Sequence, residues 1–343
     1  MRVRDETYGF DVVYNYGVYD FNTPNFYTKF ARGKLLYQLD VRRYQPFYES
    51  YVAQNRWVKQ QTLNLTYSEK QAVFNFLQNN AKPENRKYKY DFFYENCATK
   101  IRDVLKEVLG EQLAYNDDFV EEEQTFRELI QKNLHWNTWG SMGIDVALGA
   151  VIDKKASAWE YQFLPNYIFK AAETAIITRN GSKEKLVQNT TTLFKNNPTE
   201  NNSFFFTSPL FIFGLLGVLI IFITFKDRKN NTRSRLMDAT IFLITSLIGV
   251  FLLLLWVATD HTATANNYNL LWAFPLSLLL IGVIAKRFPK QWLRKYVFFL
   301  IVLLGLLMVH WITGVQVFAT ALIPLFVALA IRYIFLIGYL KRE

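Results

Sequence analysis

The residues after position 203 limit most strongly how this chain can fold, because they are dominated by long apolar runs. A helix needs about 20 apolar residues to cross the roughly 30 Å hydrocarbon core of a bilayer. Five runs qualify, although the third is short and needs its flanking residues. The predicted spans are Phe204–Phe225, Leu236–Ala258, Leu270–Ala285, Tyr296–Thr313 and Val317–Leu340. We therefore expect an all-α membrane domain of five transmembrane helices.

Basic residues are concentrated in the loops of this apolar region. Residues 201–343 carry 13 Lys and Arg against 4 Asp and Glu, whereas residues 1–200 carry 26 against 25. The loops 226–235 and 286–295 have five basic residues each, and the loop 259–269 has none. Cytoplasmic loops are enriched in Lys and Arg. This distribution predicts a cytoplasmic C-terminus with residues 1–203 outside, and it argues against nucleic-acid binding.

The preceding part divides into an extracytoplasmic domain over 1–180 and a polar linker over 181–203, ahead of the membrane domain over 204–343. Export requires a signal peptide with a basic start and an apolar stretch of about 7–15 residues. The opening MRVRDETYGFDVVYNYGVYDF contains no such stretch. We therefore expect that the extreme N-terminus is missing from this sequence. The alternative is that the domain stays in the cytoplasm and that the basic-loop rule fails.

Apolar periodicity in the first domain predicts both strands and helices. Ser68 with Gln71 is expected to form a capping box, and a helix is expected to begin at Asn96 and end at Gly110. The other predicted elements are strands near 11–19, 33–41 and 87–94 and helices over 68–80 and 125–134.

Cys97 is the only cysteine of the chain, and it lies where the predicted strand 87–94 gives way to a helix. Unpaired N–H groups and the positive dipole end of a helix stabilise an anion. Lys100 lies in the same turn, and Arg102 follows it. These features predict a thiol pKa below the ordinary value of about 8.5, and hence a nucleophilic thiolate. The alternative is a small buried cysteine that fills a gap in the core.

A nucleophilic cysteine needs a base, and the chain has three histidines. His135 follows a predicted helix as a surface or capping residue. His261 lies beside Asp260 in the neutral outer loop, and His310 lies near the outer end of the fourth span. The last two are expected on the same side of the membrane as Cys97, although His310 is equally well explained as an interfacial side chain.

Several segments resemble the Lnb N-terminal periplasmic domain family. They are NYGVYDFNTPNFYTKFARGKLLYQL, QNRWVKQQTLNLT, PENRKYKYDFFYENCATKIRDVL, MGIDVALGAVID and FLPNYI. The tail with the loop TDHTATANNYNLLWAFPL resembles full-length Lnb proteins, which are bacterial lipoprotein N-acyltransferases. The resemblance covers nearly the whole chain. It implies a permuted papain-like α+β thiol-enzyme domain, similar to lecithin retinol acyltransferase, on the periplasmic side of the cytoplasmic (inner) membrane.

The resemblance also implies a chemistry. Cys97 is the expected nucleophile, a phospholipid the acyl donor and a diacylglyceryl lipoprotein the acceptor, with no cofactor. In the family the general-base histidine precedes the cysteine, in a segment like GHTAIRV. We expect that this histidine lies upstream of Met1 and is absent here. The side chains expected to shape the pocket or contact substrate are Asn15, Tyr16, Asp20, Asn22, Asn96, Arg102, Asp260 and His261.

Other functions remain open at this point. The same nucleophile and fold would serve a membrane-tethered papain-like peptidase or amidase that acts on cell-wall peptide. A non-catalytic binding module and an inactive truncated enzyme are further alternatives. No phosphate-binding glycine loop, metal-spaced His/Cys cluster or GxSxG motif occurs in the sequence.

Overall fold

The computed structural model describes residues 1–197 and 205–341 and consists of two compact units. Unit 1 contains residues 1–124 and 156–197, and unit 2 contains residues 125–155 and 205–341. The segment 125–155, which we expected within the extracytoplasmic domain, thus packs with the membrane helices. The predicted fold class, an α+β domain followed by a helical membrane domain, is confirmed.

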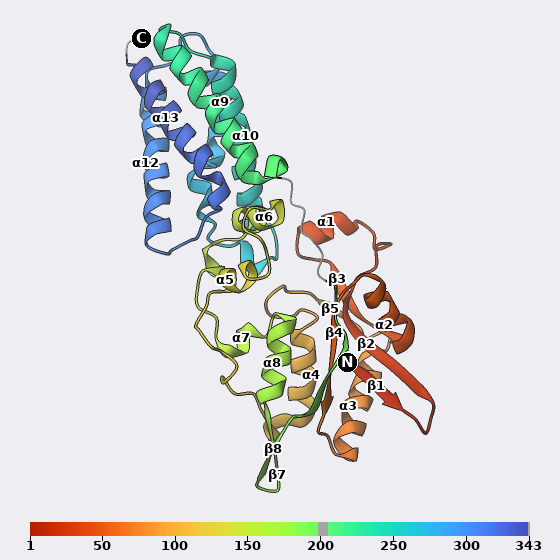
Figure 1. The fold of residues 1–343 in the computed structure, drawn as a ribbon. Coiled ribbons are helices and arrows are strands. Elements are labelled where there is room, and N and C mark those ends of the chain that lie inside the picture. The colour runs from red at the N-terminus through yellow and green to blue at the C-terminus, as the bar shows by residue number, and fades with distance from the viewer. Residues whose placement is uncertain (198–204, 342–343) are drawn as a thin grey trace. The chain divides into compact units, whose positions relative to one another are not determined.

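Unit 1 is built on antiparallel sheets (Figure 1). Its described strands form sheets of order β1-β2-β3-β5, β4-β9 and β6-β7-β8. The strands are β1 (Arg2–Asp5), β2 (Phe10–Val18), β3 (Leu36–Arg43), β4 (Val58–Leu63), β5 (Lys87–Lys89), β6 (Leu113–Ala114), β7 (Ile176–Arg179), β8 (Ser182–Lys185) and β9 (Val187–Phe194). The helices are α1 (Phe26–Ala31), α2 (Tyr44–Ala53), α3 (Tyr67–Asn80), α4 (Thr99–Leu109), α7 (Ala158–Tyr161) and α8 (Pro165–Thr174).

The core of unit 1 lies between the sheet of β2 and the helices α3 and α4. Tyr14 and Tyr16 alternate along β2 and are buried, as the period of two in a strand requires. Helix α4 contributes Val104, Leu105 and Leu109, which repeat at helical spacing. The predicted end of this helix at Gly110, which has a φ of 57°, is confirmed, whereas the helix begins at Thr99 rather than at Asn96.

Three local predictions are wrong. The capping box of α3 is formed by Thr66 and Glu69 rather than by Ser68 and Gln71, so the helix begins slightly earlier. The strand predicted over 87–94 ends at Lys89, because the Asp91 carboxylate accepts hydrogen bonds from the N–H groups of Phe93 and Tyr94 and turns the chain. The linker predicted over 181–203 is strand over 182–185 and 187–194, where it pairs with β7 and β4.

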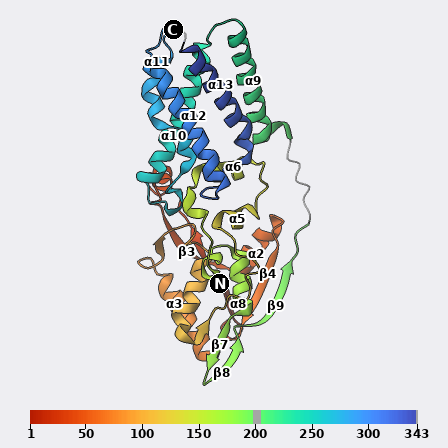
Figure 2. The same ribbon diagram turned by 90° about the vertical axis from the view of Figure 1, so that its left-hand side faces the viewer.

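Unit 2 contains long apolar helices that run side by side (Figures 1 and 2). Four of its described helical segments, at Pro209–Lys229, Arg235–Val257, Trp292–Ile312 and Thr320–Tyr339, are long and apolar enough to span a membrane. Many of their outward side chains are exposed and apolar, which suits contact with lipid. The helices are α5 (Phe126–Gln131), α6 (Trp139–Ala147), α9 (Pro209–Lys229), α10 (Arg235–Val257), α11 (Ile281–Ile284), α12 (Trp292–Ile312) and α13 (Ile323–Tyr339).

The third predicted span is a broken one. Its two parts, Thr262–Leu271 and Pro275–Ile284, meet at an angle of 48°, and much of each part is 3₁₀-helix. Pro275 lacks the N–H needed to continue an α-helix from the residues before it. Gly249 of α10 lies against the break, where a Cβ would come within 1.8 Å of the Ala273 carbonyl oxygen. The break is therefore packed against protein, where a non-helical backbone is tolerated.

Candidate active site around Cys97

Cys97 lies in a turn between β5 and α4 that is held by its neighbour Asn96. The Asn96 side-chain oxygen accepts hydrogen bonds from the N–H groups of Ala98 (2.7 Å) and Thr99 (2.9 Å). Its amide group donates to the carbonyl oxygens of Phe92 (2.8 Å) and Phe163 (2.7 Å). Asn96 is 4% exposed, so it fixes the turn and does not face a substrate. Cys97 is exposed, which argues against the gap-filling alternative.

Gly17 packs against the side chain of Cys97. It lies on β2 with a φ of 90°, in the left-handed region that favours glycine. A Cβ added to Gly17 would lie 2.9 Å from the Cys97 Cβ and 3.8 Å from its Sγ. We did not predict this role, although a glycine inside a strand pattern is a signal of close backbone approach.

Two tyrosines of the β5 region complete the surroundings of the thiol. Tyr88 and Tyr90 both interact electrostatically with Cys97. The Tyr88 ring meets the Tyr16 ring edge-on, with 6.2 Å between the ring centroids. The Tyr88 hydroxyl is buried and faces the backbone N–H of Gly17.

The predicted lowering of the thiol pKa is wrong. Although part of the Cys97 residue is exposed, desolvation of its thiol by the groups around it raises the pKa of Cys97, and the N–H groups of Cys97 and Ala98 oppose that shift only in part. The Ala98 N–H also bonds to Asn96, so it is shared. The resting thiol is therefore protonated, and a nucleophilic role requires a base that removes its proton during attack.

The two cations expected to assist the thiolate are engaged elsewhere. The Lys100 ammonium group bonds to Glu95 at 3.1 Å and lies over the Tyr88 ring. Arg102 is 5% exposed; it bonds to Asp103 at 2.8 Å and to the Trp159 carbonyl oxygen at 2.9 Å. Its guanidinium also stacks on the Trp159 ring, 3.7 Å from the centroid. Arg102 is thus a packing residue of unit 1.

The remaining predicted pocket residues of unit 1 have varied surroundings. Tyr16 is buried next to Gly17, and its hydroxyl donates to Asn80 at 2.6 Å. Asn15 is half-buried on β2 opposite Asp40 of β3. Asp20 and Asn22 are exposed and form a turn in which the Asn22 N–H donates to the Asp20 carboxylate.

Asp260 and His261 lie in unit 2, in the loop after α10. The His261 N–H donates to the Thr259 hydroxyl at 3.4 Å, and its carbonyl oxygen accepts from Thr264. His135 and His310 also belong to unit 2, so unit 1 contains no histidine in its sequence. A histidine base for Cys97 would have to come from outside the residues of unit 1.

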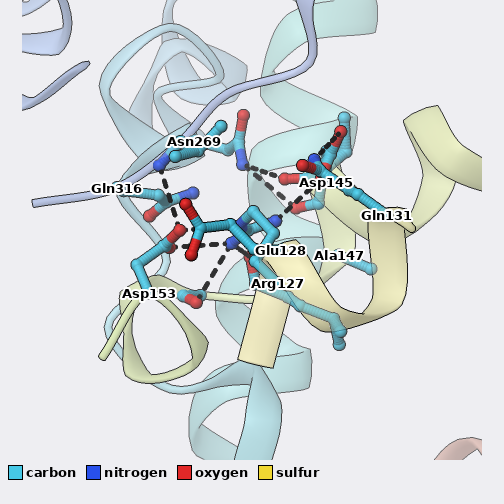
Figure 3. A network of polar contacts seen from close by, with 12 residues as sticks. Arg127, Glu128, Gln131, Asp145, Ala147, Asp153, Asn269 and Gln316 are labelled. Carbon is cyan, nitrogen blue, oxygen red and sulfur yellow. Dashed lines mark hydrogen bonds and ion pairs between the residues drawn. The ribbon is translucent and has the colours of Figure 1, made fainter. Parts of the chain in front are cut away.

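Unit 2 contains a buried polar centre around Arg127 that we did not predict (Figure 3). The Arg127 side chain is 0% exposed and binds Asp153 through two hydrogen bonds of 2.8 and 3.0 Å. It also donates to Asp145 at 3.0 Å. Burial raises the pKa of both carboxyl groups, and the guanidinium opposes that shift.

Polar bonds join this centre to the loops between the membrane helices. The Asn269 amide donates to the Asp145 carbonyl oxygen at 3.0 Å, and the Asn267 amide donates to the Val146 carbonyl oxygen at 2.8 Å. The Val317 N–H donates to the Asp153 carboxylate at 3.3 Å. The loop 259–269, which has no Lys or Arg, thus binds the segment 125–155 through its asparagines. A structural role therefore accounts for its polar side chains.

Two family models match separate regions of the chain. Residues 1–132 match the family model of the Lnb N-terminal periplasmic domain, and residues 199–343 match that of the Lnb transmembrane domain. No curated protein and no solved structure matches the chain. Both family models describe domains of Lnb proteins, and both match this one chain. The protein therefore belongs to the Lnb family, with a periplasmic domain and a transmembrane domain.

Proposed function

We propose that this protein is a lipoprotein N-acyltransferase that uses Cys97 as its nucleophile. It would move a fatty acyl group from a phospholipid to the α-amine of a diacylglyceryl-cysteine lipoprotein at the periplasmic face of the cytoplasmic membrane. The observation that carries the proposal is an exposed thiol, fixed by Asn96 and packed against Gly17, in a periplasmic domain joined to membrane helices. The basic loops support a cytoplasmic C-terminus.

The reaction would proceed in two balanced steps. The Cys97 sulfur attacks the ester carbonyl of the phospholipid while a base takes the thiol proton. The ester C–O bond then breaks, and the lyso-lipid leaves as an alcohol that receives that proton. In the second step the lipoprotein amine attacks the thioester, the C–S bond breaks, and an amide forms while the base takes the amine proton and returns it to the sulfur.

Two groups are placed to stabilise the negative oxygen of each tetrahedral intermediate. One is the backbone N–H of Cys97, which faces its own sulfur. The other is the buried Tyr88 hydroxyl, which faces the Gly17 N–H and interacts with Cys97. Donors that are fixed in advance, in a site with little water, stabilise such an oxyanion strongly.

The general base is the remaining requirement, because the thiol pKa is raised. The strands β1 and β2 pair with Arg2 opposite Val13, and Met1 accepts a hydrogen bond from the Tyr14 N–H. A segment entering β1 in the same register would run along Asn15 and Tyr16 toward Gly17, the neighbour of Cys97. We propose that a histidine on such a segment is the base.

The test compares the protein that carries this upstream segment with its Cys97→Ser variant in cells that have no other lipoprotein N-acyltransferase. Mass spectrometry of N-terminal lipopeptides reports the number of acyl chains. We expect triacylated lipopeptides with the wild type and only diacylated ones with the variant at equal protein abundance. Triacylation that survives in Cys97→Ser would overturn the proposal. An altered cell-wall peptide profile with unchanged lipopeptides would identify a peptidase or amidase instead.

A further inference from the structure

The segment 19–34 of unit 1 presents aromatic side chains to solvent, and we refer to Tyr19, Phe21, Phe26, Tyr27 and Phe30 as the aromatic ledge. Phe21 is 67% exposed, Tyr27 is 80% exposed and Phe30 is 53% exposed. Helix α1, which carries three of the five rings, has no buried residue. A helix this short gains little stability from its own hydrogen bonds and usually needs packing of an apolar face. A group of exposed aromatic rings on such a helix is typical of an interaction site.

The rings of the aromatic ledge contact one another and continue toward Cys97. Phe21 lies 4.9 Å from Phe26 and 5.0 Å from Tyr19, measured between ring centroids. Tyr19 lies 5.4 Å from Tyr37, which stacks on Tyr90 at 4.2 Å. Tyr90 is in turn a neighbour of Cys97. The ledge is therefore an ordered surface that leads to the thiol.

The charge beside the ledge is mainly positive, with Asp20 as the one acidic residue in the segment 19–34. Lys29, Arg32 and Lys34 lie on α1 or directly after it, and no acidic residue occurs between Asp20 and Asp40. Aromatic rings with neighbouring Lys and Arg are typical of segments that lie in the boundary between headgroups and acyl chains. Anionic headgroups attract such basic residues by about 1 kcal/mol each.

We propose that the aromatic ledge inserts into the surface of a phospholipid bilayer that contains anionic lipid, with Lys29, Arg32 and Lys34 at the phosphate groups. This contact does not depend on acyl transfer. It would hold the periplasmic domain at the lipid surface and bring the Cys97 side of unit 1 close to its headgroups.

The single cysteine of the chain makes a direct test possible. In a Cys97→Ser background, Phe30→Cys is labelled with an environment-sensitive fluorophore, and the full chain is placed in nanodiscs of phosphatidylcholine and phosphatidylglycerol. Bromine atoms on the acyl chains quench a fluorophore that contacts them. Tyr27→Cys is a second position in case Phe30→Cys does not fold. The matched control is Lys183→Cys, on the exposed β7–β8 hairpin at the other end of unit 1 from α1 (Figure 1).

We expect brominated lipid to quench about half of the emission at position 30, because an interfacial segment lies about 5–10 Å deep in this boundary, and to leave position 183 unchanged. Reversal of the charges at Lys29, Arg32 and Lys34 to Glu should restore the emission at position 30. Equal emission with and without bromine at positions 27 and 30, or quenching unaffected by charge reversal, would overturn the proposal. All variants lack the Cys97 thiol, so the result is independent of the proposed catalysis.

Discussion

Gly17 is the single residue whose side-chain size bears most directly on the thiol. In Gly17→Ala the new Cβ would lie 2.9 Å from the Cys97 Cβ, and the backbone would keep a φ of 90° that alanine rarely adopts. We expect the rate of acyl transfer to fall by about tenfold or more, because displacing a reacting group by even 1 Å can cost more than that. The measurement is the initial rate of lipopeptide acylation with purified protein.

The control for this prediction is Gly9→Ala, which also has a positive φ, of 66°, but no atom within 4 Å of the added Cβ. It should lower stability through backbone strain while leaving the rate unchanged. Equal rates for wild type and Gly17→Ala would mean that the packing of Cys97 against β2 is unimportant for the reaction.

Glu69 links the start of α3 to β7 and gives unit 1 a pH-dependent contribution to stability. Hydrogen bonds from Arg179, the shortest at 2.6 Å, lower the pKa of Glu69 from 4.5 to about 2. The contribution is present above pH 4.5 and is lost as the pH falls toward 2, since the unfolded carboxylate takes up a proton first. Glu69→Gln keeps a residue able to form the capping box and should lose about 1 kcal/mol at pH 7.

Chemical denaturation at pH 7 and at pH 2.5 measures this effect. The difference in unfolding free energy between the variant and wild type should shrink at the lower pH. Glu84→Gln, at an exposed position, should match wild type at both values. A constant difference between wild type and Glu69→Gln across this range would contradict the assigned role of Arg179.

Helix α4 shows which features of the site the sequence pattern predicted and which it did not. Its end at Gly110 was predicted, but the helix begins at Thr99 rather than at Asn96, whose side chain accepts a hydrogen bond from the Thr99 N–H. The thiol pKa was not predictable in this way. It depends on the burial of the thiol in the folded unit, where Gly17, 80 positions earlier in the sequence, packs against Cys97.

The broken third span depends on a close approach to α10 that only glycine permits. In Gly249→Ala the new Cβ would overlap the Ala273 carbonyl oxygen, so the break at 271–275 must shift. We expect the melting temperature in detergent to fall by several degrees, equivalent to about 1–3 kcal/mol for overpacking. Gly305→Ala on α12, where the Cβ meets no atom within 4 Å, should leave it unchanged or raise it. A similar effect of both variants would contradict the close packing of the break.

The division of the molecule into two units does not follow the order of the chain. Residues 125–155 lie between two parts of unit 1 in sequence but pack with the membrane helices. The membrane spans could be predicted from apolar runs, because each run is a continuous stretch of the sequence. The Arg127 centre could not be predicted, since its partners Asp145, Asp153 and Val317 come together only through tertiary folding.

Arg127→Met tests whether this centre holds the segment 125–155 in place. The variant leaves Asp145 and Asp153 buried without their guanidinium, which typically costs about 3–5 kcal/mol. We expect faster proteolytic cleavage within 125–155 and a lower melting temperature. Lys132→Met, at an exposed position just after α5, is the matched control and should behave like wild type. Unchanged cleavage in Arg127→Met would show that other contacts hold the segment.

The most direct test of the whole account is the detection of the acyl-enzyme. Protein purified from the membranes in which it is made is incubated with a phospholipid that carries an alkyne-labelled acyl chain, without any lipoprotein. The label on the peptide that contains Cys97 is then measured by mass spectrometry before and after hydroxylamine, which cleaves thioesters. We predict a hydroxylamine-sensitive acyl group on Cys97 that disappears when a diacylglyceryl lipopeptide is added. A labelled lipopeptide formed by a protein in which Cys97 never carries the acyl group would contradict the account.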